Sequence, residues 1–157
     1  MPSPTLNRQP IFTSTPILAT SQFDPAIPTS FKDPGMDTGT SIFTDTSTYG
    51  SLITKVTVTA TGKLGDNVTN KIIYLGIQDV VNSVVTLYQS KVMTGKTGLT
   101  STDQVPYVVF EFGGGLVMSA TSGYKLILAA STNNATTGEV GDQVSVVVEG
   151  GTYDYLG

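Results

Sequence analysis

Hydrophobic and polar residues alternate along much of this chain, most clearly over residues 52–61. In that segment the two sets are Leu52, Val56, Val58 and Ala60 against Lys55, Thr57, Thr59 and Thr61. A period of two places the apolar side chains on one face of a half-buried β-strand. The continuous apolar run at 72–77 instead predicts a strand that is covered on both faces.

Short runs of this kind recur to the end of the chain, separated by Gly, Asn, Asp and Ser, which favour turns. Seven strands are predicted, at 41–44, 52–61, 71–78, 83–92, 107–112, 124–130 and 143–149. A further short strand is predicted near 116–118, with Gly113-Gly114-Gly115 as a hinge or bulge before it. No run of ten residues has helical periodicity. The sequence therefore predicts an all-β antiparallel β-sandwich, of the jelly-roll type.

The first 38 residues have a different character, because seven of the eight prolines lie at or before Pro34. Proline fixes φ, lacks an N–H donor and favours extended backbone in the preceding residue. We therefore expect residues 1–38 to form an extended arm, and residues 39–157 to form the sandwich domain. Linkers rarely contain large apolar residues, yet this segment does. We expect eight of them to be anchors that bind a partner: Leu6, Ile11, Phe12, Ile17, Leu18, Phe23, Ile27 and Phe31.

The composition argues against catalysis. The 157 residues include no Cys and no His. A disulfide, a cysteine nucleophile and a thiolate metal site are therefore excluded, as is a Ser-His-Asp triad. The commonest general base and metal ligand is missing as well. We expect no enzymatic activity, no cofactor and no bound metal.

The charge pattern argues against nucleic acid as a partner. The net charge is −4, and the basic residues are one arginine, Arg8, and seven scattered lysines. Binding to phosphates needs clustered Lys and Arg. No apolar run approaches the ~18 residues of a membrane-spanning helix, and the N-terminus lacks the pattern of a secretory signal. We expect no contact with membranes.

Three other features have an ordinary explanation and a functional one. Glu111 and Glu149 lie in apolar strands, where they are expected to face solvent rather than to form a glycosidase pair. Asp33 and Asp37 lie in a loop with Gly35, which is typical of a turn and lacks the spacing of a calcium-binding EF-hand loop. The seven tyrosines are common strand residues, although a cluster of them would suit a carbohydrate.

Several stretches resemble a known family: Gly39–Thr44, Tyr49–Gly62, Gly115–Val117, Gly123–Leu126 and Val147–Tyr153. Together they are similar to small β-sandwich structural proteins of tailed bacteriophages, over roughly residues 39–153. The resemblance implies a virion protein and carries over no catalytic or binding residues.

The expected function is that of a capsid decoration (cement) protein, assembled in the host cytoplasm. Such a protein would form a homotrimer and clamp major capsid subunits with its N-terminal arm. The alternative is a tail or baseplate protein that binds receptor glycans, and a glycan-active enzyme is the weakest hypothesis. The destination of the apolar arm distinguishes the first two.

Overall fold

The computed structural model describes residues 15–28, 39–61, 64–82, 84–118, 123–132 and 143–153. Within these ranges the chain forms eight β-strands and no helix. The strands are β1 (Thr15–Phe23), β2 (Thr40–Thr44), β3 (Ser51–Ala60), β4 (Lys71–Asp79), β5 (Val84–Met93), β6 (Tyr107–Met118), β7 (Tyr124–Ala130) and β8 (Val144–Thr152). All seven strands predicted after residue 39 are present.

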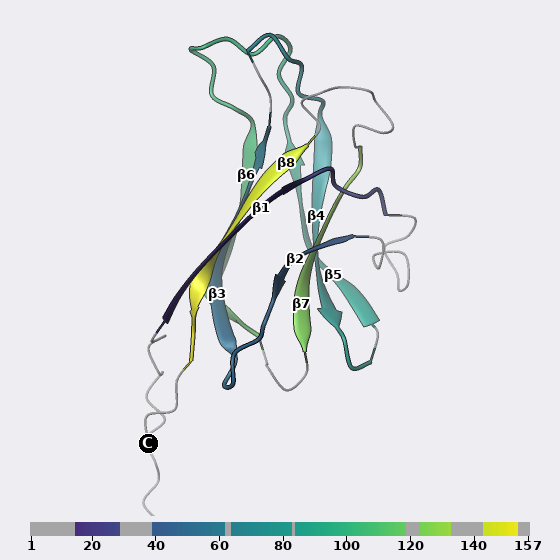
Figure 1. Ribbon diagram of the computed structural model, residues 1–157. Helices are drawn as coiled ribbons and strands as arrows, with labels where there is room; N and C mark the ends of the chain where they lie inside the picture. The colour runs from purple at the N-terminus through teal and green to yellow at the C-terminus, as the bar shows by residue number, and fades with distance from the viewer. Residues whose placement is uncertain are drawn as a thin grey trace, which may run out of the picture.

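The strands form two antiparallel sheets of four, packed face to face (Figure 1). The first sheet has the order β1-β8-β3-β6 and the second has the order β2-β7-β4-β5. The strands therefore form nested pairs, as in one long hairpin that is folded over on itself: β1–β8, β2–β7, β3–β6 and β4–β5. This double Greek key is the jelly roll, so the predicted fold class is confirmed.

The core lies between the sheets. From the first sheet, Val56, Val58 and Phe110 are buried, and from the second, Ile73 and Leu75. The alternation in β3 has one irregularity, because a β-bulge shifts the register between Ile53 and Lys55. Because of this shift, the residues before the bulge face the opposite side from the one that strict alternation would give them. Ile53 is therefore buried and Leu52 is not. Strict alternation had placed Leu52 in the core.

A smaller apolar cluster covers part of the outer face of the second sheet. Tyr74, Val85, Ile127 and Ala129 are buried there, and Leu87 packs against them. β4 therefore buries Ile73 and Leu75 on its inner side and Tyr74 on its outer side. This arrangement agrees with the prediction, made from its continuous apolar run, that β4 is covered on both faces.

The structure corrects the predicted boundary of the sandwich. Residues Thr15–Phe23, expected to belong to the arm, form β1 and pair with β8 along their whole length. Ile17, Ala19 and Phe23 pack against the core. Proline density misled the prediction, because the segment contains only Pro16, close to its start, and an edge strand tolerates proline there. The sandwich therefore includes nine residues of the predicted arm.

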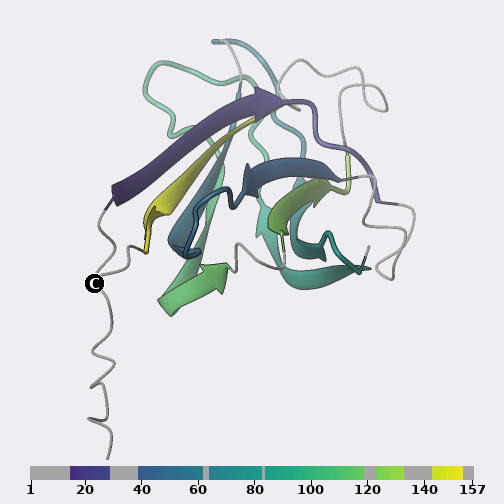
Figure 2. The same ribbon diagram turned by 60° about the horizontal axis from the view of Figure 1, so that its bottom comes forward.

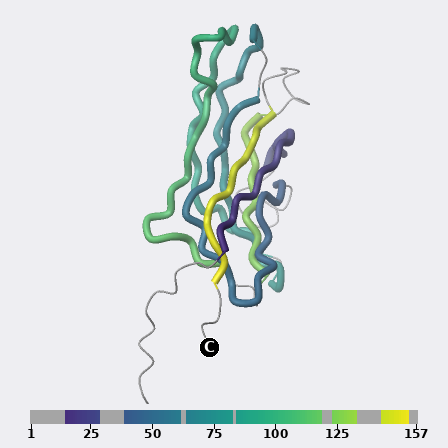
Figure 3. Tube along the Cα trace, turned by 60° about the vertical axis from the view of Figure 1, so that its left-hand side comes forward, coloured from purple at the N-terminus to yellow at the C-terminus, as the bar shows by residue number. Residues whose placement is uncertain are grey.

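β6 is also longer than predicted. It continues through the three glycines to Met118, and it pairs with β3 on both sides of them. The partners of Ile53 and Lys55 are Leu116 and Glu111, so four residues of β6 lie opposite one residue of β3. Gly114 and Gly115 have φ angles of 90° and 88°, which glycine adopts readily. The expected bulge is therefore present, and it bends β6 outward (Figure 3).

Candidate functional site

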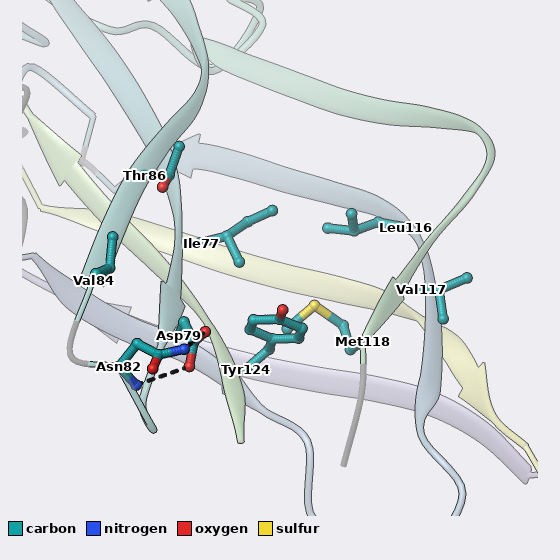
Figure 4. Close-up of a pocket in the computed structure, with 9 residues that line it drawn as sticks. All are labelled: Ile77, Asp79, Asn82, Val84, Thr86, Leu116, Val117, Met118 and Tyr124. Carbon is teal, nitrogen blue, oxygen red and sulfur yellow. Dashed lines mark hydrogen bonds between the residues drawn. The ribbon is translucent and has the colours of Figure 1, made fainter. Parts of the chain in front are cut away.

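A groove of about 590 Å³ lies at one end of the sandwich (Figure 4). It lies between the two sheets, where β6 ends and β5 begins. Its lining consists of Ile77, Asp79, Asn82, Val84, Thr86, Leu116, Val117, Met118 and Tyr124. The volume is in the range of sites that bind small molecules.

The bulge in β6 supplies one wall of this groove. Leu116 follows the three glycines and points across the groove toward Ile77 of β4 (Figure 4). Val117, at the rim, is 62% exposed. The ring of Tyr124 lies between the two walls (Figure 4). The groove is thus mainly apolar, with the hydroxyls of Tyr124 and Thr86 and the amide of Asn82 as its neutral polar groups.

The carboxylate in the groove, Asp79, stabilises the β4–β5 turn. Its Oδ1 accepts hydrogen bonds from the backbone N–H groups of Val81 and Asn82, at 3.0 and 3.1 Å. Its Oδ2 accepts one from Nδ2 of Asn82 at 2.7 Å. The bonds from Asn82, and then that from Val81, hold the pKa of Asp79 below its usual value. Asp79 is therefore ionised and suited to a turn, whereas a general acid needs a raised pKa.

A second carboxylate, Asp45, is buried in the loop between β2 and β3. Its Oδ1 accepts hydrogen bonds from the backbone N–H and the hydroxyl of Ser47, at 2.9 and 2.6 Å, and from the hydroxyl of Ser51 at 2.9 Å. This arrangement closes the loop rather than presenting a reactive group. Asp side chains commonly accept a hydrogen bond from the backbone two residues on, so the sequence itself contains a signal for this turn.

Glu111 and Glu149 lie on either side of Lys55 across the first sheet. Lys55 is the cross-strand partner of both, and its Nζ is 2.7 Å from Oε2 of Glu149. The hydrogen bond and charge of Glu149 raise the pKa of Lys55, and the charge of Glu111 adds to this. Glu111 is exposed and the Glu149 side chain is partly so. The two carboxylates thus face solvent, as predicted, and the structure adds that they flank a lysine.

The tyrosines are distributed over several elements. Tyr74 is buried in the cluster on the outer face of the second sheet. Tyr88 packs against Phe112, with the ring centroids 5.6 Å apart. Tyr49 and Tyr107 are exposed, on a loop and at the start of β6. Tyr124 lines the groove. Of these five tyrosines, Tyr74 and Tyr88 have the structural role expected of strand residues.

The four predicted anchors that the structure describes differ in their surroundings. Ile17 and Phe23 pack against the core, so they belong to the sandwich. Leu18, between them in the alternation of β1, is 71% exposed, and Ile27 is exposed as well. Leu6, Ile11, Phe12 and Phe31 lie outside the described residues, as does the 33–37 loop. The binding role of these residues stays a prediction.

The groove and the start of β1 share one end of the sandwich. Thr15 pairs with Thr152, Thr152 with Ser51, and Ser51 with Met118, so these four residues form one row across the first sheet. Met118 lines the groove. β1 therefore begins at the end of the sandwich that holds the groove.

Comparisons with models of known protein families and with curated proteins found no match. Within the described ranges, no group of three or more acidic side chains is placed to hold a metal ion. The same ranges contain no helix that could cross a membrane.

Proposed function

We propose that this protein is a structural component of a virion, a capsid decoration protein that binds major capsid subunits through its N-terminal segment. The observation that carries the proposal is the position of β1. This strand begins at Thr15, at the edge of the first sheet. The proline-rich segment before it therefore joins the sandwich at an edge, where it can reach a partner without disturbing the core.

The fold is compatible with this proposal. Jelly rolls occur in viral capsid proteins and also in lectins, so the fold allows both of the functions expected from the sequence. The resemblance of residues 39–153 to phage structural proteins favours the virion. The carboxylates of Asp45 and Asp79 stabilise turns, and that of Glu149 forms an ion pair, which are structural roles.

The anchors of the proposed segment differ from those first expected. Ile17 and Phe23 pack against the core, so they are not free to bind a partner. The remaining candidate anchors are Leu6, Ile11 and Phe12, which precede β1, and the exposed Leu18 on β1. Prolines restrict the unbound segment, so less conformational entropy is lost when it binds. Large apolar side chains that enter pockets contribute most of the energy in such contacts.

A test follows from the boundary at Thr15. Deletion of residues 1–14 leaves all eight strands intact, so the shortened protein should keep its circular dichroism spectrum and melting temperature. We expect it to bind particles that lack the protein at least about tenfold more weakly than the full chain does. Replacement of Leu6, Ile11 and Phe12 by serine should have the same effect, whereas alanine at Asn7 and Gln9 should not. A shortened protein that decorates particles as tightly as the full chain would overturn the proposal.

A second candidate, a tail protein that binds receptor glycans, is favoured by the groove. The Tyr124 ring can stack on the apolar face of a sugar, and the Thr86 hydroxyl and Asn82 amide can bond to its hydroxyls. Titration with a panel of neutral oligosaccharides, followed by NMR, tests this candidate. Binding that Tyr124→Ala abolishes and Val92→Ala preserves would favour it over decoration, and no shift with any sugar would exclude it for that panel.

A further inference from the structure

The two sheets leave four edge strands, which differ in how well they are protected. An edge strand presents unpaired N–H and C=O groups, and proteins usually shorten it, bend it or place charges on it. β2 has five residues and a bulge. β5 and β6 each contain a bulge and a charged residue, Lys91 or Glu111. Three of the four edges are therefore protected against pairing with another strand.

β1 lacks most of these protections. It has nine residues, contains no charged side chain, and pairs with β8 from Thr15 to Phe23 without a shift in register. Figure 2 shows it as the outermost strand of the first sheet. Its residues facing away from the core, Leu18, Thr20 and Gln22, are exposed. Its one proline, Pro16, lies near the start and leaves most of the edge regular. β1 is thus a long, uncharged edge that is open on one side in the described structure.

We propose that the edge of β1 binds β1 of a second copy of this chain. The two strands pair antiparallel across a twofold axis, which joins the two first sheets into one sheet of eight strands. The proposal goes beyond the decoration function and does not depend on it.

The properties of β1 itself favour a second copy as the partner. A strand that pairs with its own copy meets an edge of equal length, and here neither strand brings a charge that would oppose the contact. The twofold axis also brings the outward-facing Leu18 of one copy beside outward-facing residues of the other, which covers the most exposed apolar residue of the strand. The 1–14 segment fits this edge less well, because Pro2, Pro4 and Pro10 would interrupt the ladder.

The proposed contact fixes the number of copies in the assembly. A contact in which the same strand serves both partners is isologous and closes at two copies. It cannot produce the homotrimer expected from the sequence, which needs a threefold contact. The mass of the protein in solution therefore distinguishes the two arrangements.

The first test is the molar mass of the full chain by sedimentation or light scattering across a wide concentration range. We expect a reversible dimer of twice the 16.4 kDa chain mass. Leu18→Lys and Thr20→Lys should each weaken dimerisation at least about tenfold, because like charges meet at the axis and must lose water. Val92→Lys is the matched control, since Val92 is 67% exposed on the edge strand β5. It should leave the dimer unchanged.

Because the chain contains no cysteine, a second test can use introduced cysteines without interference from native ones. Single cysteines at positions 18, 20 and 22 should form disulfide-linked dimers on mild oxidation, most readily at the position nearest the axis, and Val92→Cys should not. A protein that is monomeric at every concentration, or trimeric, overturns the proposal. A dimer that keeps its affinity in both folded lysine variants, or that crosslinks only at position 92, overturns it as well.

Discussion

The hydroxyl of Ser51 donates a hydrogen bond to Oδ1 of Asp45 at 2.9 Å, in a site where Ser51 is 1% exposed and Asp45 is 6% exposed. This bond joins the loop after β2 to the first residue of β3. Because β2 and β3 belong to different sheets, it helps to fix the passage of the chain from one sheet to the other at the groove end. The same oxygen also holds Ser47, so one carboxylate organises the whole loop.

Asp45→Ala should lower the free energy of unfolding by about 2–3 kcal/mol. The substitution leaves the buried hydroxyl of Ser51 without its acceptor, and an unsatisfied buried polar group costs about 1–3 kcal/mol. Urea unfolding followed by circular dichroism measures the change. Ser47→Ala is the control and should cost less, because that site is only partly buried. An Asp45→Ala protein within about 0.5 kcal/mol of the parent would show that the loop does not need the carboxylate.

Gly150→Ala should be among the most damaging single substitutions in the first sheet. A Cβ at this position would lie 2.1 Å from the carbonyl oxygen of Leu52 and 3.0 Å from Cα of Ile53, both backbone atoms of β3 next to its bulge. Backbone in the centre of a sheet cannot move aside cheaply, so we expect a loss of about 3 kcal/mol or more. Gly113→Ala is the matched control, because a Cβ there meets nothing within 4 Å. Thermal melting of both variants checks the difference, and equal melting temperatures would contradict it.

The protein should lose stability in acid partly through Asp79 and Asp103. Hydrogen bonds from Asn82 lower the pKa of Asp79, and hydrogen bonds from Thr100, with Lys96 in addition, lower that of Asp103. A carboxylate with a lowered pKa in the fold stabilises it above the unfolded value of about 3.9, and this contribution is lost as the pH falls through the folded pKa. The urea concentration at the midpoint of unfolding should therefore decrease as the pH is lowered below about 4.

Asp103→Asn separates the contribution of one turn from the rest of this acid effect. Asparagine keeps the shape of the side chain but does not titrate in this range. The variant should be less stable than the parent at neutral pH and should show a smaller fall in its urea midpoint between about pH 5 and about pH 2. A variant whose midpoint falls as steeply as that of the parent would remove Asp103 from the explanation.

The sequence was most informative where the local pattern and the packing agree. The alternation in β3 and the apolar run of β4 specified strands and faces, because in-out periodicity follows directly from the geometry of a pleated strand. The alternation could not locate the bulge at Thr54, which decides that Ile53 and not Leu52 is buried. That choice depends on the pairing with β8, where the consecutive residues Gly150 and Glu149 are the partners of Ile53 and Lys55.

The groove could not be predicted from the sequence, because it forms between β5 and β6, and the sequence does not show that these strands lie at the edges of the two sheets. Ile77, Tyr124 and Leu116 come from three strands of two sheets, and no spacing along the chain connects them. β1 was missed for a different reason. A proline-rich composition averaged over 38 residues concealed the interval between Pro16 and Pro25, which is long enough for a strand and carries apolar residues at Ile17, Ala19 and Phe23.

This interval leads to a prediction about where the folded unit begins. Removal of residues 1–14 should leave the stability almost unchanged, whereas removal of residues 1–23 should lower it by at least about 3 kcal/mol. The longer deletion uncovers the core residues against which Ile17, Ala19 and Phe23 pack, and burial of a large apolar side chain contributes roughly 1.5–3 kcal/mol when complete. It also turns β8, which lies between β1 and β3, into an edge strand. Chemical unfolding and light scattering of the two truncated proteins at equal concentration measure stability and aggregation together. If the chain that begins after Phe23 is as stable and as soluble as the one that begins at Thr15, β1 is an accessory strand, and the folded unit begins near residue 39, as the proline pattern first indicated.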